Sequence, residues 1–88
     1  MLTSQEIYEF IEGYKRNHPP GQQRLGQYFS NVHIDRLQNE GKLIFRNTDP
    51  IDFVGEYYDP TTCKILRDPF WAKDEDAEKI IWEDYLLP

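Results

Sequence analysis

Arg24, Gln27 and Asn31 form the densest group of hydrogen-bonding side chains in the sequence, directly after a Pro-Pro-Gly break. Their spacing of three and four residues places them on one face of a predicted helix. Such a face can bond to backbone carbonyl groups at the two helix ends, or it can form a polar recognition strip beside Tyr28. We expect the structural role, because backbone groups at a helix end beside such a break need partners.

Gly26 lies inside this predicted helix, where glycine costs about 1 kcal/mol relative to alanine. A helix accepts that cost where a side chain would block the close approach of another backbone. The sequence therefore predicts that another segment of the chain packs tightly against Gly26.

Side chains suited to catalysis or metal binding are few. His18 and His33 are the only groups with an ordinary pKa near neutral pH, and neither has a nucleophile or carboxylate at a motif spacing. We expect His33 to hydrogen-bond backbone groups. One cysteine and two histidines cannot complete a four-ligand zinc set without several carboxylates, and Cys63 is expected to be a half-buried strand residue. The sequence predicts no enzyme, no metal and no cofactor.

The composition favours one small domain, residues 1–88, with an aromatic core. Five Phe, six Tyr and two Trp in 88 residues supply large apolar areas. Because Tyr and Trp are also favoured at interfaces, the same excess favours a protein partner. So small a core is not expected to hold all three of the large side chains Trp71, Trp82 and Leu86. A homodimer that covers those left outside is therefore a further hypothesis.

Charge is divided unevenly along the chain. The net charge is −6, with +1 through Thr48 and −7 from Asp49 onward. The acidic half should repel nucleic acid, and it either keeps the domain soluble or forms a docking surface for a basic protein. A nucleic-acid patch would have to use the basic residues of the first half, namely Lys15, Arg16, Arg24, Arg36, Lys42 and Arg46.

The single cysteine indicates a reducing compartment, so we expect a cytoplasmic protein. The first residues lack a basic region followed by an apolar run, and no apolar stretch approaches the ~18 residues of a membrane span. The sequence therefore predicts a soluble protein with no secretory signal and no contact with a membrane.

A first helix is predicted from Leu2 to about Asn17, with Thr3 as N-cap, Glu6 completing a capping box and Leu2 packing on Ile7. Its inward stripe is Ile7, Phe10, Ile11 and Tyr14.

A second helix is predicted over residues 22–32, with an inward stripe of Leu25, Tyr28, Phe29 and Val32. Ile34 and Leu37 fall on a different face. This phase slip predicts a break near Asn31–His33 and a short third helix that ends at Gly41. One continuous helix to Glu40 is the alternative.

Three short strands follow, at Lys42–Arg46, Ile51–Tyr57 and Cys63–Leu66, with turns at Asn47–Pro50 and Asp59–Thr62. Gly55 is expected to lie at a bulge.

Asp74 is expected to cap the last helix, whose inward stripe of Ala77, Ile80, Ile81 and Tyr85 is widened by Trp82 and Leu86. The predicted fold class is α+β, with two to three N-terminal helices, a small antiparallel hairpin or three-stranded sheet, and a C-terminal helix.

This order of elements is also that of a winged-helix domain, in which the third helix enters the major groove of DNA. The segment Ile34–Glu40 offers one arginine and two amides beside two acids, and Asp49 carries a negative charge where phosphates would lie. Nucleic-acid binding is therefore the alternative hypothesis, less favoured than binding to a protein.

The pattern Arg24-Leu25-Gly26-Gln27 with Asn31 follows the stretch Asn17–Pro20 and precedes a Thr48–Pro50 turn and Tyr58-Asp59. This arrangement resembles small uncharacterised phage and prophage proteins, in which an Arg-aliphatic-Gly-Gln pattern with a trailing Asn opens a helix. The resemblance covers residues 17–59. It implies a phage or prophage origin and brings no known function with it.

Together these observations predict a small non-enzymatic module for protein–protein interaction whose partner is unidentified. Its expected binding residues are Arg24, Gln27, Tyr28, Asn31 and Trp82.

Overall fold

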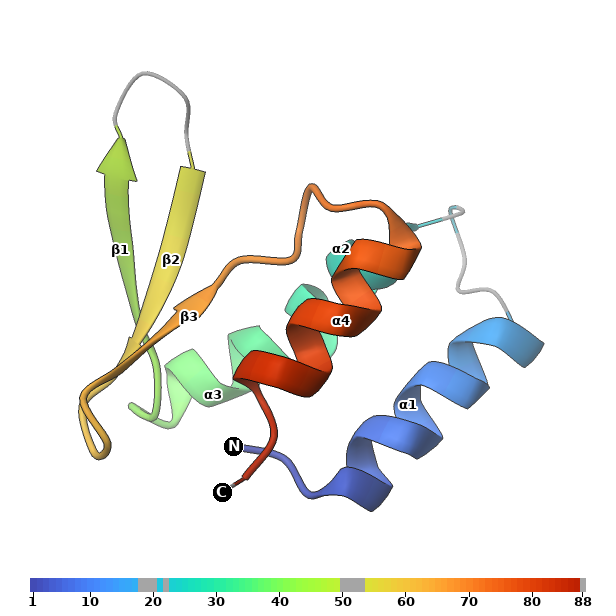
Figure 1. Cartoon of the computed structure of the whole chain (residues 1–88), viewed down its shortest axis with the longest axis horizontal. Coiled ribbons are helices and arrows are strands. Elements are labelled where there is room, and N and C mark those ends of the chain that lie inside the picture. Colours follow the sequence, from blue (N-terminus) through green and yellow to red (C-terminus); the bar gives the residue numbers. More distant parts are fainter. Residues whose placement is uncertain (18–20, 22, 50–53, 88) are drawn as a thin grey trace.

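The computed structural model describes residues 1–17, 21, 23–49 and 54–87, so the expectations for His18 and Pro50 lie outside the described residues. The turn expected at Asn47–Pro50 is wrong for its described part, because residues 47–49 belong to the first strand. Helices lie on one side of a three-stranded sheet, and the hairpin of its first two strands extends beyond them (Figure 1). This is the predicted α+β class. In chain order the elements are α1 (Ser4–Arg16), α2 (Leu25–Phe29), η1 (Ser30–Ile34), α3 (Asp35–Asn39), β1 (Ile44–Asp49), β2 (Val54–Asp59), β3 (Lys64–Arg67) and α4 (Asp74–Asp84).

Helix α1 begins as predicted. The Thr3 hydroxyl oxygen accepts a hydrogen bond from the Glu6 N–H, and the Glu6 carboxylate accepts one from the Thr3 N–H, both at 3.1 Å. Leu2 and Ile7 on either side of this capping box are buried. The helix ends at Arg16, one residue before the expected end, with Asn17 as its C-cap. The capping box thus fixes where the chain turns into α1.

Residues 25–39 form one helical run, so the predicted break near Asn31–His33 is wrong and the alternative of a continuous helix is confirmed. The middle of the run, η1, is π-helical, with the Asp35 N–H donating to the Ser30 carbonyl five residues earlier. A π turn adds one residue to the helix without interrupting its hydrogen bonding. The phase slip in the sequence is therefore the sign of a π segment.

The π segment explains which side chains of this run are buried. Leu25 and Phe29 face the core before it, and Ile34 and Leu37 face the core after it. Phe29 and Ile34 are five residues apart, the spacing that one π turn brings to the same face. Val32, which was predicted to point inward, is instead 40% exposed.

The helical run stops where Gly41 was expected to stop it. Gly41 has a φ of +74°, in the left-handed region that glycine adopts without strain. The Gly41 N–H donates to the Gln38 carbonyl at 3.0 Å, and the Lys42 N–H donates to the Leu37 carbonyl at 2.8 Å. This pair of bonds is a Schellman motif, and it turns the chain into β1.

The sheet is antiparallel, in the order β1-β2-β3. The inner face, toward the helices, carries the row Phe45, Tyr57 and Leu66, and the outer face carries the row Ile44, Tyr58 and Ile65. The register shifts between Asn47, which pairs with Gly55, and Asp49, which pairs with Val54. Gly55 therefore lies at an irregularity as expected, and the extra residue is in β1. A side chain at Gly55 would overlap the Phe45 ring, which accounts for glycine there.

Cys63 was expected in a strand, but it lies exposed in the turn between β2 and β3 with a φ of +60°. This turn is closed by Asp59. Its carboxylate accepts the Thr61 N–H at 2.9 Å and the Thr62 hydroxyl at 3.0 Å, and its carbonyl accepts the Cys63 N–H at 2.8 Å.

The sequence predicted that Asp74 caps α4, but this is wrong: Asp74 caps the N-terminus of α2. Its carboxylate accepts the Leu25 N–H at 2.9 Å and the Tyr14 hydroxyl at 3.0 Å. The N-cap of α4 is Lys73, whose side chain makes no capping bond. The first turn of α4 therefore joins α1 and α2 through one carboxylate.

The termini and the last helix close the core. Leu2 and Leu86 form a parallel bridge, with the Leu2 N–H donating to the Tyr85 carbonyl at 3.0 Å and the Leu87 N–H donating to the Leu2 carbonyl at 2.8 Å. Ala77, Ile81 and Tyr85 of the predicted inward stripe are buried. Ile80, Trp82 and Leu86 are partly buried against the same cluster, which draws on every helix and on all three strands or their ends.

Candidate functional site

The close approach predicted at Gly26 is made by Pro69, in the turn between β3 and α4. A Cβ at Gly26 would overlap the carbonyl oxygen of Pro69, and both residues are buried. Since this carbonyl lies where a side chain would start, alanine cannot take the place of Gly26 without movement of the turn. The contact fixes the start of α2 against the segment that precedes α4.

The turn that contains Pro69 is held by its own hydrogen bonds. The Asp68 carboxylate accepts the Phe70 N–H at 3.0 Å, and the Ala72 N–H donates to the Pro69 carbonyl at 3.1 Å. Burial raises the pKa of the Asp68 carboxyl, and the Phe70 N–H opposes that rise. A hydrogen-bonded turn thus connects the sheet to the last helix.

This turn presents Trp71 to solvent. Trp71 is 69% exposed, more than any other large hydrophobic side chain among the described residues. The Arg24 guanidinium lies 5.4 Å from the centre of its ring, within range of a cation–π interaction, and the half-buried Phe70 ring lies edge-on at 4.8 Å. We call Arg24, Phe70 and Trp71 the Trp71 platform.

The other residues of the predicted polar strip do not join the platform. Asn31 is exposed and its amide donates to the Gln23 side chain at 3.0 Å; within the described residues this side-chain amide forms no hydrogen bond with a backbone carbonyl. Tyr28 is half-buried and stacks on Phe10 at 5.1 Å. Gln27 is half-buried beside them. Among the described residues, Arg24 is the only member of the strip that contacts an exposed aromatic ring.

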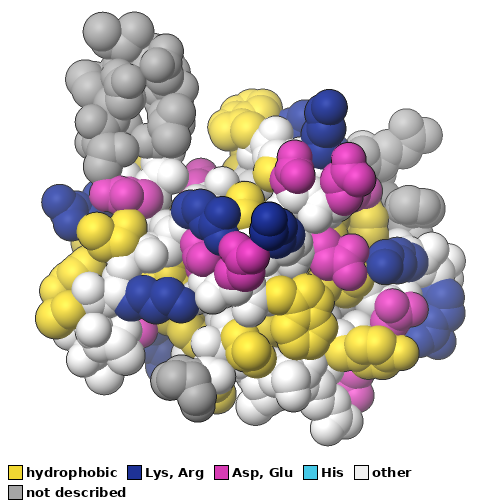
Figure 2. Space-filling model, viewed as in Figure 1, with side chains coloured by type: hydrophobic (Ala, Val, Ile, Leu, Met, Phe, Trp, Pro, Cys, Tyr) yellow, Lys and Arg dark blue, Asp and Glu magenta, His cyan; other side chains and the backbone are white. Residues whose placement is uncertain are grey.

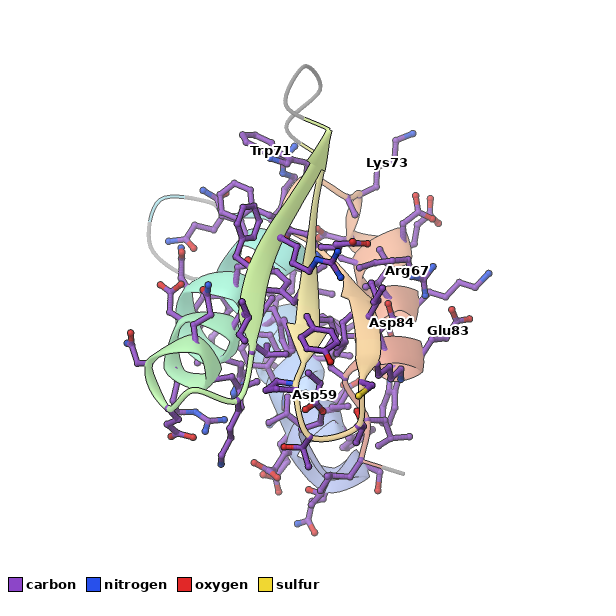
Figure 3. The ribbon with its side chains drawn as sticks, turned by 90° about the vertical axis from the view of Figure 1, so that its left-hand side faces the viewer. Asp59, Arg67, Trp71, Lys73, Glu83 and Asp84 are labelled. Atoms are coloured by element: carbon purple, nitrogen blue, oxygen red, sulfur yellow. The ribbon has the colours of Figure 1, made fainter. Side chains whose placement is uncertain are left out.

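Trp82 lies at the opposite end of α4 from Trp71, so the sequence-predicted site residues are not gathered in one place. It lines an open groove of about 460 Å³ together with Met1, Asp59, Thr62, Lys64, Glu83, Asp84, Leu86 and Leu87. Trp71 and Asp59, which mark the platform and this groove, lie at opposite ends of the sheet (Figure 3). The carboxylates of Asp59 and Asp84 in this groove already accept hydrogen bonds from other residues of the chain. The Lys64 ammonium donates to the backbone carbonyls of Glu83 and Asp84.

Arg67 and Asp84 join β3 to α4 at the rim of this groove. The Asp84 carboxylate accepts the Arg67 backbone N–H at 2.8 Å and its Nε at 2.9 Å, and Glu83 accepts its Nη2 at 2.7 Å (Figure 3). Burial would raise the pKa of the Asp84 carboxyl, but the hydrogen bonds from Arg67 outweigh it and lower the pKa below its ordinary range. This pair is structural: it closes the edge of the sheet.

Three of the six basic residues of the first half already pair with carboxylates. Lys15 lies 3.6 Å from Glu78, and both Arg36 and Lys42 pair with Glu40 at 3.3 Å and 3.0 Å. On the face in Figure 2, basic and acidic side chains alternate with hydrophobic ones between them. In addition, residues 25–39 form one helical run, so Ile34–Glu40 is not the separate third helix that the winged-helix alternative requires.

The His33 ring packs among other rings, and within the described residues it forms no hydrogen bond with a backbone group. Its ring centroid lies 4.9 Å from that of Phe10 and 5.3 Å from that of Phe29, and its Nδ1 lies 3.5 Å from an Arg36 nitrogen. Burial lowers the pKa of His33, and the positive charge of Arg36 lowers it further. In the described part of the chain, no group of three His, Cys, Asp or Glu side chains could hold a metal ion.

Comparison of the chain with protein-family models, with curated proteins and with solved structures gives no match. Over residues 1–17, 21, 23–49 and 54–87, no helix is long and apolar enough to cross a membrane.

Sequence reasoning missed the platform because Trp71 was assigned to the core or a dimer contact. The signal was present in Asp68-Pro69-Phe70-Trp71, where an Asp-Pro turn is followed directly by two aromatic residues.

Proposed function

We propose that this chain is a non-enzymatic module that binds another protein through the Trp71 platform. The exposure of Trp71 on a turn that packs closely against Gly26 is the observation that supports this function. Full burial of a large apolar side chain contributes roughly 1.5–3 kcal/mol of favourable free energy. Because Trp71 is largely exposed, most of this free energy is still to be gained when a partner covers its ring. Tryptophan and arginine are also the residues most enriched among those that dominate binding energy at protein interfaces.

Preorganisation adds to this argument. The Gly26–Pro69 contact and the bonds within the turn fix the backbone on which Trp71 stands, and Arg24 restrains its ring. A partner that covers such a ring loses less side-chain and loop freedom than one that must order a mobile loop. The platform therefore has the two properties of an interface centre, exposed aromatic area and a fixed shape.

Charges around the platform favour a basic partner. Glu75 and Asp76 are exposed in the first turn of α4 and form no ion pair among the described residues. The whole chain carries −6, which attracts a basic surface and accelerates its association at low salt.

Two further parts of the proposal concern where the protein acts and where it comes from. The exposed Cys63 thiol favours a reducing, cytoplasmic setting. The resemblance of residues 17–59 to phage and prophage proteins favours a phage or prophage origin.

Affinity capture from a lysate of the source cells tests the function with matched variants. Trp71→Ala should lose a partner that the unmodified chain retains, whereas Tyr8→Ala, which removes a 59% exposed aromatic residue from α1, should keep it. Glu75→Lys with Asp76→Lys should slow association with that purified partner. Equal capture by Trp71→Ala and Tyr8→Ala would exclude the platform. Binding of duplex DNA that weakens steeply with salt would instead support the nucleic-acid alternative.

A further inference from the structure

Asp59 and Asp84 are the two buried carboxylates among the described residues, and they differ in whether a cation lies beside them. Asp84 pairs with the Arg67 guanidinium at 2.9 Å. Asp59 is 8% exposed, and within the described chain no basic nitrogen lies within 4.0 Å of its carboxylate oxygens. Buried charges in proteins are ordinarily paired. The charge of Asp59 is therefore left for a cation from outside the chain.

Hydrogen bonds keep the Asp59 carboxyl ionised. Burial would raise its pKa, but the Thr61 N–H and the Thr62 hydroxyl donate to the carboxylate oxygens and lower the pKa below its ordinary value. The charge of the Met1 amino group also lowers this pKa, although the group lies too far away to form an ion pair. Because a carboxylate has about four lone-pair sites, bonds from Thr61 and Thr62 leave room for a further donor.

Two lysines line the hollows that Asp59 lines, and other groups hold both of them. Lys64 lies opposite Asp59 in the register of β2 and β3, but its ammonium donates to two carbonyls at the end of α4, at 3.2 Å and 3.3 Å. Lys42, which lines a smaller hollow beside the groove, pairs with Glu40 at 3.0 Å. Neither lysine therefore neutralises the Asp59 carboxylate.

Apolar side chains line the groove next to this carboxylate. Trp82 is half-buried, and Met1, Leu86 and Leu87 lie beside it in the groove lining. A tryptophan ring contacts hydrocarbon chains and also attracts the cations that such chains carry. The groove has a volume of about 460 Å³, within the range of roughly 300–1,000 Å³ that is typical of small-molecule sites.

We infer that this groove binds a small molecule that carries a primary ammonium group on a short apolar chain. The ammonium group donates to the Asp59 carboxylate, and the chain packs against Trp82 and Leu86. A metal ion is a poorer occupant, because no group of three His, Cys, Asp or Glu side chains in the described residues could hold one. The inference does not depend on the Trp71 platform, which lies at the opposite end of the sheet (Figure 3).

Titration of the ¹⁵N-labelled chain with pentylammonium chloride tests this site. The Trp82 indole N–H signal should shift and saturate at millimolar concentrations, and the Trp71 signal should stay in place. The alcohol 1-pentanol has the same chain without the charge, and methylammonium has the charge without the chain. Each should bind more weakly than pentylammonium by about tenfold, because each makes only one of the two contacts.

Asp59→Asn separates charge from shape, because an amide oxygen can still accept the Thr61 N–H. This variant should weaken the binding of pentylammonium by about tenfold. Asp76→Asn is the matched control: it removes the same charge from the exposed start of α4 and should leave the affinity unchanged. Circular dichroism confirms that both variants are folded.

Three results would overturn the inference. They are equal binding of pentylammonium and 1-pentanol, equal affinity of the Asp59→Asn and Asp76→Asn variants for pentylammonium, and a Trp82 signal that pentylammonium does not move. The comparison with 1-pentanol uses the unmodified chain, so it decides the question even where Asp59→Asn fails to fold.

Discussion

The carbonyl oxygen of Pro69 occupies the space that a side chain at Gly26 would need. This contact joins the first residues of α2 to the turn before α4, two segments more than forty residues apart in sequence. The same turn carries Trp71, and the same end of α2 carries Arg24. A packing contact between two backbones therefore positions the two side chains that we propose as the centre of binding.

Gly26→Ala should destabilise the protein by about 2 kcal/mol, because the new methyl group forces the Pro69 turn to move. Gly13→Ala is the control: it also replaces a helical glycine, but among the described residues no atom beyond the neighbouring backbone of α1 lies within 4 Å of its added Cβ. That variant should gain up to about 1 kcal/mol from helix propensity. Urea denaturation measures both changes. Stabilisation by Gly26→Ala would show that the contact with Pro69 is not tight.

Asp74→Ala should cost about 1–2 kcal/mol, because it removes the cap of α2 and the acceptor of the Tyr14 hydroxyl together. Asp76→Ala removes another carboxylate from the first turn of α4, where it is exposed. Its effect should stay within about 0.5 kcal/mol. Thermal unfolding of the two variants distinguishes two explanations of how Asp74 stabilises the protein, as the cap of α2 or as a favourable negative charge at the start of α4. Equal losses would support the second explanation.

Asp84→Asn should destabilise the protein by about 2 kcal/mol at pH 7, since three hydrogen bonds from Arg67 then lose their charged acceptor. The folded-state pKa of Asp84 is lowered, so its contribution is present above its ordinary pKa near 3.8 and is lost as the pH falls through the lowered value. The difference between variant and unmodified chain should therefore shrink in acid. Glu83→Gln, which alters an exposed pair with the same Arg67, should cost less than about 1 kcal/mol.

His33 should titrate below its ordinary pKa of about 6.5, because burial and Arg36 both favour the neutral ring. A lowered histidine pKa means that the unfolded chain binds the proton more readily, so stability decreases as the pH falls through 6.5 toward the folded value. Nuclear magnetic resonance of the ring protons measures the pKa in the folded chain and in urea. A higher pKa in the folded chain would place His33 in a more solvated or more acidic environment.

Local chemistry predicted those parts of the fold that short-range contacts determine. The capping box at Thr3 and the left-handed stop at Gly41 involve residues within six positions of each other, so their patterns are visible in sequence. The phase slip near Asn31–His33 was also visible, but a π turn and a break produce the same shift in periodicity. Sequence therefore located the irregularity without identifying its form.

Long-range partners could not be read from the sequence. Asp74 has the residue type and position of an N-cap for its own helix, yet its carboxylate accepts the N–H of Leu25, forty-nine residues away. The need for glycine at position 26 was predictable, but the identity of Pro69 depends on tertiary packing. Arg24 was recognised as a binding residue for its spacing with Gln27 and Asn31, whereas its contact in the structure is Trp71.

The two tryptophans offer the most direct test of the proposed function. Their indole N–H groups give separate signals in a ¹⁵N-labelled chain, one at the platform and one at the groove on the opposite end of α4. We predict that the partner captured by the unmodified chain shifts or broadens the Trp71 signal on titration and leaves the Trp82 signal in place. A titration that moves the Trp82 signal while Trp71 stays unchanged would contradict binding through the platform.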